Sequence, residues 1–206
     1  MGGILISDVE GVLLSDEYLP KLAEREGKAE EVLEITEKGI KGDISWERGL
    51  RERLHILQGT SIGNAKKVVE ELSFTKGARD LTQELRKRDY TLIGVTGGFK
   101  LFAEKVKDEL ELDYIISNEL EFKDGKLKGL KKLNVGMDEI VGLEEILKDE
   151  NADKRTVTAI ADGANNLMLF KHADKKIAFN AQKIIKEEAD HVIKGKDLKK
   201  TLDFMP

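Results

Sequence analysis

The chain has 206 residues, of which 40% are hydrophobic and 36% charged, and its formal net charge at pH 7 is -5. This length allows one α/β domain with or without a small insertion, and the apolar fraction excludes global disorder. A modest acidic balance with interspersed charges gives no electrostatic reason to expect binding to nucleic acid or to an anionic membrane. Because there is no cysteine, disulfides, thiolate metal sites and thiol nucleophiles are excluded.

No stretch approaches eighteen consecutive apolar residues, and no basic segment precedes the short apolar run near the N-terminus. We therefore expect a cytoplasmic protein.

Short apolar runs that end at turn residues recur along the chain, as is typical of buried parallel strands. They occupy residues 3–7, 91–95, 114–117 and 156–160, with weaker examples at 176–179 and 191–193. Amphipathic helical patterns at residues 78–88 and 101–110 lie between them. This alternation predicts a doubly wound, Rossmann-like α/β fold with a parallel sheet.

Two segments interrupt this alternation. Residues 18–72 show helical patterns and no convincing strand, which predicts a helical cap inserted after the first strand. Two alternating runs around Asp124-Gly125 predict a small β-hairpin. We therefore assign residues 1–14 and 73–206 to the core and residues 15–72 to the cap.

Polar motifs follow three of the predicted strands. They are Asp8-Val9-Glu10-Gly11, Thr96-Gly97-Gly98-Phe99 and Asp162-Gly163-Ala164-Asn165-Asn166. In doubly wound sheets ligands bind beyond the carboxyl ends of the strands, so these motifs are expected in one crevice. Carboxylates suit Mg²⁺, a hydroxyl with glycine N–H groups suits a phosphate, and a carboxylate can attack phosphorus. Each motif alone is equally an ordinary strand end or helix cap.

Together the motifs resemble those of the haloacid dehalogenase superfamily, in its phosphoserine phosphatase branch, over essentially the whole chain. That family has D-x-D-[GS]-T, S-G-G-F and G-D-G-A-N-D at the corresponding places. The resemblance implies that Asp8 is a phosphorylated nucleophile and that Glu10 protonates the leaving alkoxide. It implies phosphate contacts from Thr96, Gly97, Gly98 and Asn165. It also implies Mg²⁺ ligation by Asp8, the backbone carbonyl of Glu10, Asp162 and Asn166.

The resemblance extends into the cap. It implies that Glu17 meets the ammonium group of a phosphoserine-like substrate and that Arg53 meets its carboxylate. The alternative for Arg53 is an ordinary solvated charge, since Arg48 and Arg51 are close in the sequence.

Three positions depart from the family pattern. Glu10 replaces the second aspartate, as in the related phosphoserine:homoserine phosphotransferases. Asn166 replaces the closing aspartate, which removes one negative charge from the Mg²⁺ site. The family's lysine near the start of a helix is missing, because Val141 or Glu139 stands at the matching position. Loss of that positive charge predicts slow phosphoryl transfer.

Two classes of function remain open. The first is a Mg²⁺-dependent phosphomonoester hydrolase or phosphotransferase that acts on a small phosphorylated metabolite. The second is a degenerate, non-catalytic protein that binds a small phosphate or amino acid. The retained motif residues favour the enzyme, which we expect to be a monomer or homodimer.

Overall fold

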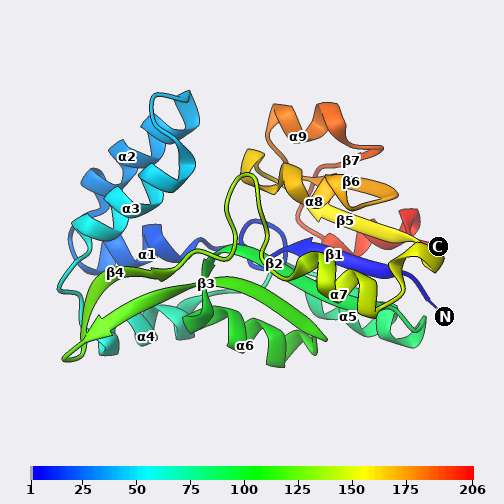
Figure 1. The fold of residues 1–206 in the computed structure, drawn as a ribbon, viewed down its shortest axis with the longest axis horizontal. Helices are drawn as coiled ribbons and strands as arrows, with labels where there is room; N and C mark the ends of the chain where they lie inside the picture. The colour runs from blue at the N-terminus through cyan, green and yellow to red at the C-terminus, as the bar shows by residue number, and fades with distance from the viewer. Residues whose placement is uncertain (1) are drawn as a thin grey trace.

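The computed structural model describes residues 2–206, and within them seven strands form one sheet (Figure 1). The strands are β1 (Ile4–Asp8), β2 (Thr91–Phe99), β3 (Tyr114–Lys123), β4 (Lys126–Lys132), β5 (Val157–Ala161), β6 (Lys175–Phe179) and β7 (His191–Ile193). Their spatial order is β4-β3-β2-β1-β5-β6-β7. All neighbours pair in parallel except β3 and β4, which form an antiparallel hairpin. The predicted doubly wound α/β fold is confirmed.

Four helices lie within residues 18–72, the segment for which a helical cap is predicted. They are α1 (Tyr18–Arg25), α2 (Ala29–Lys41), α3 (Trp46–Ile56) and α4 (Ile62–Glu71). The remaining helices are α5 (Ala78–Lys87), α6 (Lys100–Leu110), α7 (Leu143–Asp149), α8 (Leu167–Lys171) and α9 (Lys183–Glu188), with 3₁₀ turns η1 (Ala152–Lys154), η2 (Ala164–Asn166) and η3 (Leu198–Phe204). In residues 2–206 no helix is long and apolar enough to cross a membrane. The division into core and cap stays a prediction.

Alternation of side chains along the strands produces a hydrophobic core on each face of the sheet. Leu5 belongs to a cluster that includes residues of α5 and α6, whereas Ile4 and Ile6 belong to a second cluster with residues of α7, α8 and α9. The buried side chains of α1, α3 and α4 belong to the first cluster. The inserted helices therefore share a continuous core with one face of the sheet.

Two strands are longer than the sequence predicts. Thr96-Gly97-Gly98 follows the strand predicted at residues 91–95, but in the structure β2 continues to Phe99 and α6 begins at Lys100. The pairing of β2 with β3 shifts register between Val95 and Phe99, and Gly98 N–H donates to Thr96 Oγ1 (2.9 Å). A local side-chain bond and two glycines thus produce a bulged strand in place of a helix start. Similarly, β3 merges a predicted strand with the first arm of the hairpin.

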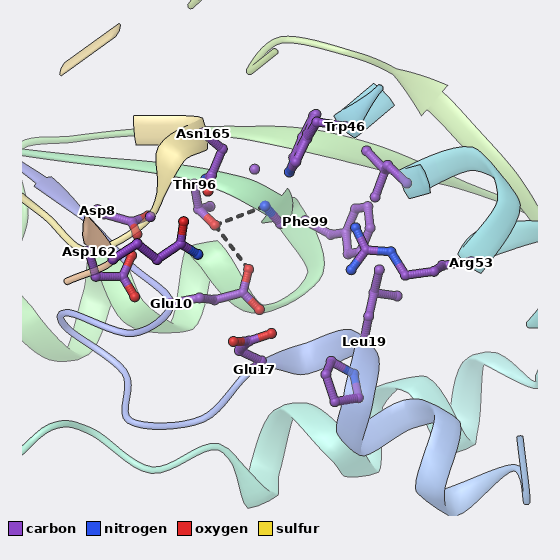
Figure 2. Close-up of a pocket in the computed structure, with 16 residues that line it drawn as sticks. Asp8, Glu10, Glu17, Leu19, Trp46, Arg53, Thr96, Phe99, Asp162 and Asn165 are labelled. Carbon is purple, nitrogen blue, oxygen red and sulfur yellow. Dashed lines mark hydrogen bonds between the residues drawn. The ribbon is translucent and has the colours of Figure 1, made fainter. Parts of the chain in front are cut away.

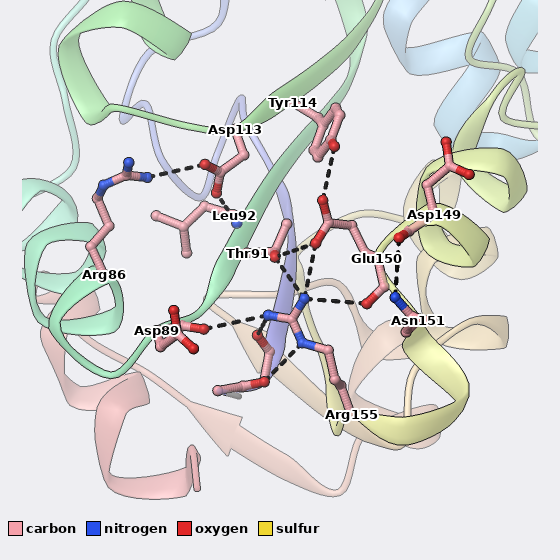
Figure 3. A network of polar contacts seen from close by, with 12 residues as sticks. Arg86, Asp89, Thr91, Leu92, Asp113, Tyr114, Asp149, Glu150, Asn151 and Arg155 are labelled. Carbon is pink, nitrogen blue, oxygen red and sulfur yellow. Dashed lines mark hydrogen bonds and ion pairs between the residues drawn. The ribbon is translucent and has the colours of Figure 1, made fainter.

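A buried polar network joins the amino ends of β1 and β2 to the end of α7 (Figure 3). The side chain of Arg155 is 6% exposed. It donates to the Gly3 carbonyl (2.8 Å), to Thr91 Oγ1 (2.8 Å) and to Glu150 Oε2 (2.9 Å). Thr91 Oγ1 also donates to Glu150 Oε2 (2.8 Å). The network lies at the amino ends of the strands, whereas the motif residues lie beyond the carboxyl ends. It therefore stabilises the fold and is not part of the site that the motif residues form.

We expect Arg155→Ala to lower the free energy of unfolding by about 2 kcal/mol, because it removes the cation paired with a partly buried carboxylate and one of the two donors to the buried Gly3 carbonyl. Urea denaturation measures this. The matched control is Arg88→Ala, which removes an exposed i,i+4 pair with Glu84 and should cost no more than about 0.5 kcal/mol. Equal losses in the two variants would show that the network adds nothing to stability.

Candidate active site

The carboxyl ends of β1, β2 and β5 meet at a cavity of about 150 Å³ (Figure 2). Nine of the ten predicted site residues line it. They are Asp8, Glu10, Glu17, Arg53, Thr96, Gly97, Gly98, Asp162 and Asn165. The central position of β1 between β2 and β5 explains why motifs far apart in the sequence converge here.

Two carboxyl groups, of which one is buried and the other half-buried, face each other in this cavity. Asp8 ends β1, is 3% exposed, and accepts a hydrogen bond from Val9 N–H at Oδ1 (2.8 Å). Burial, and then the negative charge of Asp162, raise the pKa of Asp8 well above its ordinary value. The pKa of Asp162, which directly follows β5, is also raised, chiefly by burial. Such a pair is stable only with a shared proton or with a cation beside it.

This donor set fits a hard divalent cation. In residues 2–206, neither Asp8 nor Asp162 takes part in an ion pair, so no basic side chain neutralises them. The same residues contain no group of three or more His, Cys, Asp or Glu side chains able to hold a metal ion. A cation here would rely on two carboxylates and a backbone carbonyl, which are oxygen donors that suit Mg²⁺ with several waters retained.

Asn166 is the one predicted site residue that does not line the cavity. It is 3% exposed, and its Oδ1 accepts a hydrogen bond from Gly163 N–H (3.2 Å). The amide therefore braces the turn that carries Asp162. Its assignment as a metal ligand stays a prediction.

Glu10 is fixed by two hydrogen bonds. Its Oε1 accepts from Tyr18 N–H (2.8 Å) and its Oε2 accepts from the Thr96 hydroxyl (3.2 Å). Burial raises the pKa of Glu10 to about 7. A carboxyl group that holds a proton near neutral pH and points into a cavity is suited to general acid–base chemistry.

The two glycines of the second motif bring the backbone close to the cavity. A Cβ atom on Gly98 would lie 2.3 Å from Glu10 Oε2, and one on Gly97 would lie 2.6 Å from the Trp46 ring. Neither position tolerates a larger residue without displacement of a side chain that lines the cavity. The buried Thr96 hydroxyl connects this segment to Glu10.

The recognition residues come from the inserted helices. Glu17 is the N-cap residue of α1, and Arg53 lies in α3 with its Nε donating to the Gly49 carbonyl (3.2 Å). Figure 2 shows Arg53 across the cavity from Asp8. Burial lowers the pKa of Arg53, which Glu10 and Glu17 partly counteract. Arg53 is therefore not a solvated helix charge; that description fits Arg48, which is exposed and pairs with Glu52.

Gln182 also lines the cavity, although no sequence motif predicts it as a site residue. Its backbone N–H donates to the Asp162 carbonyl (2.7 Å), and its Oε1 accepts from Ala164 N–H (3.2 Å). Gln182 thus clamps the turn that carries Asp162. It lies in the loop after β6, outside every motif. The only signal was its position beyond the carboxyl end of a weakly predicted strand.

No lysine takes the place of the one that the family pattern requires. Val141 and Glu139, the two candidates for the matching position, are exposed, and neither lines the cavity. Among residues 2–206, Arg53 is the one lysine or arginine in the cavity lining. The side that holds Asp8 and Asp162 therefore lacks a basic side chain.

Comparisons with known proteins agree with this geometry. Residues 5–169 match the family model described as haloacid dehalogenase-like hydrolase. The chain is 35% identical over 204 residues to a phosphoserine phosphatase of Methanocaldococcus jannaschii, covering 98% of this chain and 97% of that protein. It is 34% identical over 207 residues to a phosphoserine phosphatase of Streptococcus thermophilus, covering 98% and 95%.

Solved structures show the same similarity. A substrate-bound phosphoserine phosphatase complex superposes with a TM-score of 0.92 at 33% identity, covering 100% of this chain and 99% of the other. A phospho-aspartyl intermediate analogue of phosphoserine phosphatase gives a TM-score of 0.92 at 34% identity with the same coverage. The family and the fold inferred from the sequence are therefore confirmed.

Gly11 provides a test of how the carboxylate pair is built. Its φ is +83°, and a Cβ atom there would lie 2.0 Å from Asp162 Oδ2. We expect Gly11→Ala to displace the Asp162 carboxylate and to weaken Mg²⁺ binding at least tenfold by calorimetry, since oxygen position and charge determine affinity in such sites. The control is Gly27→Ala, because Gly27 has a φ of +68° and nothing within 4 Å of its Cβ position.

Both variants share the backbone penalty of about 1 kcal/mol for a left-handed alanine. Only Gly11→Ala should change Mg²⁺ affinity. Unchanged affinity in Gly11→Ala would remove Asp162 from the proposed cation site.

Proposed function

Because this chain belongs to the haloacid dehalogenase-like hydrolase family, we propose that it hydrolyses a phosphoserine-like monoester through an aspartyl-phosphate intermediate. The observation that carries the proposal is the combination, in one cavity, of buried Asp8, a Glu10 whose pKa is about 7, and the Glu17 and Arg53 pair. The first two groups suit phosphoryl transfer, and the second two suit the charged ends of an amino acid. The expected cytoplasmic location and monomeric or homodimeric state stay predictions.

Magnesium is the cofactor that we propose. Asp8, Asp162 and the backbone carbonyl of Glu10 would hold it, and it would supply the positive charge that keeps both carboxylates ionised and draws negative charge from the phosphoryl group. An ionised Asp8 is required because a protonated carboxyl group is a poor nucleophile.

In the first step, an Asp8 carboxylate oxygen attacks phosphorus and the bond from phosphorus to the serine oxygen breaks. The hydrogen bond from Val9 N–H to Oδ1 holds the Asp8 carboxylate in place at the end of β1. Glu10 donates its proton to the leaving serine alkoxide, which departs as the alcohol. The bonds from Tyr18 N–H and Thr96 to Glu10 keep this acid in position.

In the second step, water attacks the phosphorus of the aspartyl phosphate. Glu10, now ionised, accepts a proton from that water, and the bond between phosphorus and the Asp8 oxygen breaks. Phosphate leaves, and Asp8 and protonated Glu10 are regenerated. Thr96, the two glycines beside it and Asn165 surround the phosphoryl group in both steps.

We expect Asp8→Asn to abolish phosphate release from phosphoserine, because an amide cannot form the aspartyl phosphate. An assay of phosphate release from phosphoserine, run on the wild-type protein and on Asp8→Asn with and without Mg²⁺, measures this. Wild-type turnover is itself expected to be slow, since no lysine lines the cavity.

Phosphoserine binding by the wild-type protein without Asp8-dependent phosphate release would favour the non-catalytic alternative. Transfer of phosphate to an alcohol in place of water would favour a phosphotransferase.

Substrate recognition is tested with Arg53→Ala. Loss of a charge-assisted bond to the substrate carboxylate should raise KM for phosphoserine by about ten- to a hundredfold, while turnover of methyl phosphate is unchanged. Arg48→Ala, on the exposed side of the same helix, should leave both substrates unaffected. If Arg53→Ala changes the kinetics of phosphoserine and methyl phosphate to the same extent, the substrate is not a phosphorylated amino acid. The protein is then a phosphatase of another specificity.

A further inference from the structure

The segment Thr96-Gly97-Gly98 lines the cavity but lies in a part of β2 that the sheet does not hold. The pairing of β2 with β1 ends at Val95, and its pairing with β3 is interrupted between Val95 and Phe99. A peptide unit between two glycines has no Cβ atom on either side to restrict its rotation. Other contacts must therefore determine where its carbonyl oxygen points.

Two hydrogen bonds fix the peptide unit between Gly97 and Gly98. The Gly98 N–H donates to Thr96 Oγ1 (2.9 Å), and the Gly97 carbonyl accepts from Nδ2 of Asn118 in β3 (2.8 Å). Asn118 is fully buried and does not line the cavity, so the carbonyl oxygen is directed away from the cavity. A carbonyl oxygen that faced the cavity would repel a phosphoryl group there, because both carry negative charge.

The side-chain amide of Asn118 uses its whole hydrogen-bonding capacity. Its Nδ2 also donates to the Val135 carbonyl (3.2 Å), and its Oδ1 accepts from the N–H groups of Asn134 (2.7 Å) and Val135 (2.9 Å). An amide offers two donors and two acceptor positions, and all four are occupied. Because two carbonyls face one atom of the amide and two N–H groups face the other, the amide has a single favourable orientation. The donor to Gly97 is therefore fixed.

The loop that holds Asn118 is anchored in turn. Gly136 N–H donates to the Glu139 carbonyl (2.9 Å), which closes a turn within the loop. Met137 N–H donates to Glu47 Oε1 (2.9 Å), which docks the loop against α3. The amide therefore has a rigid base on one side and the glycine segment of the cavity on the other.

From these contacts we propose that Asn118 is a positioning residue for the phosphoryl group, because its Nδ2 holds the Gly97 carbonyl out of the cavity. The proposal rests on the proposed function, which places the phosphoryl group beside this segment. Since Asn118 does not line the cavity, it acts only through Gly97. Its effect is confined to the phosphoryl end, because Glu17 and Arg53, proposed for the amino-acid end, come from α1 and α3.

The test is Asn118→Asp, which keeps an oxygen for the N–H groups of Asn134 and Val135 and replaces the donor to Gly97 with a second oxygen. At about pH 8 the new carboxyl group is ionised and has no proton to donate. Calorimetry in the presence of Mg²⁺ measures the dissociation constants of inorganic phosphate and of L-serine. We expect the Kd of phosphate to rise about tenfold, the effect of one lost hydrogen bond, while the Kd of L-serine is unchanged.

Asn118→Ala removes the same donor without adding a charge and should weaken phosphate binding to a similar extent. The matched control is Asn134→Ala, which removes a neighbouring side-chain bond to the Ser117 carbonyl (2.8 Å) and leaves Gly97 untouched. This control should bind both ligands as the wild-type protein does.

An unchanged Kd of phosphate in Asn118→Ala would overturn the proposal. Equal weakening of phosphate and L-serine binding in the Asn118 variants would also overturn it, because Asn118 would then only support the fold. A wild-type protein that binds neither ligand would reject the proposed function itself.

Discussion

The close approach of two carboxyl groups, Asp8 and Asp162, is the constraint on which the rest of the site depends. Their positions follow from the pairing of β1 with β5, which brings two strand ends side by side. Burial raises the pKa of both groups, and the negative charge of Asp162 raises the pKa of Asp8 further. Several contacts fix the turn around Asp162. Gly11 leaves room for the Asp162 carboxylate, while Asn166 and Gln182 form hydrogen bonds to the backbone of the turn. The proposed cation, or a proton shared by the two carboxyl groups, would relieve the repulsion between them.

The charge balance of the cavity explains why chemistry and recognition occupy opposite sides. Asp8, Asp162 and Glu17 contribute negative charge, and Arg53 is the sole basic residue among the described residues that line the cavity. An anionic phosphoryl group would therefore depend on the proposed cation, on the Thr96 segment and on the proton of Glu10 for favourable contacts. No lysine of residues 2–206 lines the cavity beside the proposed nucleophile, so the site lacks a fixed positive charge that a mobile cation would replace only in part. This balance is the reason for the expected slow turnover.

Much of the architecture could be predicted because it depends on local patterns. Apolar runs and helical periodicity predicted the strands and helices. The rule that ligands bind beyond the carboxyl ends of parallel strands predicted a common site, and nine of the ten predicted residues line one cavity. The predictions failed where tertiary context decides the outcome. The glycines after Thr96 look like a helix start, but pairing with β3 draws them into a bulged strand. No sequence motif corresponds to Gln182 or to the cavity that Ile40 lines, because each depends on loops that folding brings together.

The two halves of the site have different physical support. Asp8 and Thr96 belong to paired strands whose hydrogen bonds fix them closely. Arg53 belongs to α3, which is held by side-chain packing and by the contact between Glu47 and Met137. Packed apolar side chains tolerate substitutions that conserve volume, whereas the residues of a hydrogen-bonded sheet tolerate fewer changes. The inserted helices can therefore alter the size and polarity of the accepted ester while the strand ends retain one chemistry. A site divided in this way allows the enzyme to change its substrate without rebuilding the carboxylate pair on which phosphoryl transfer depends.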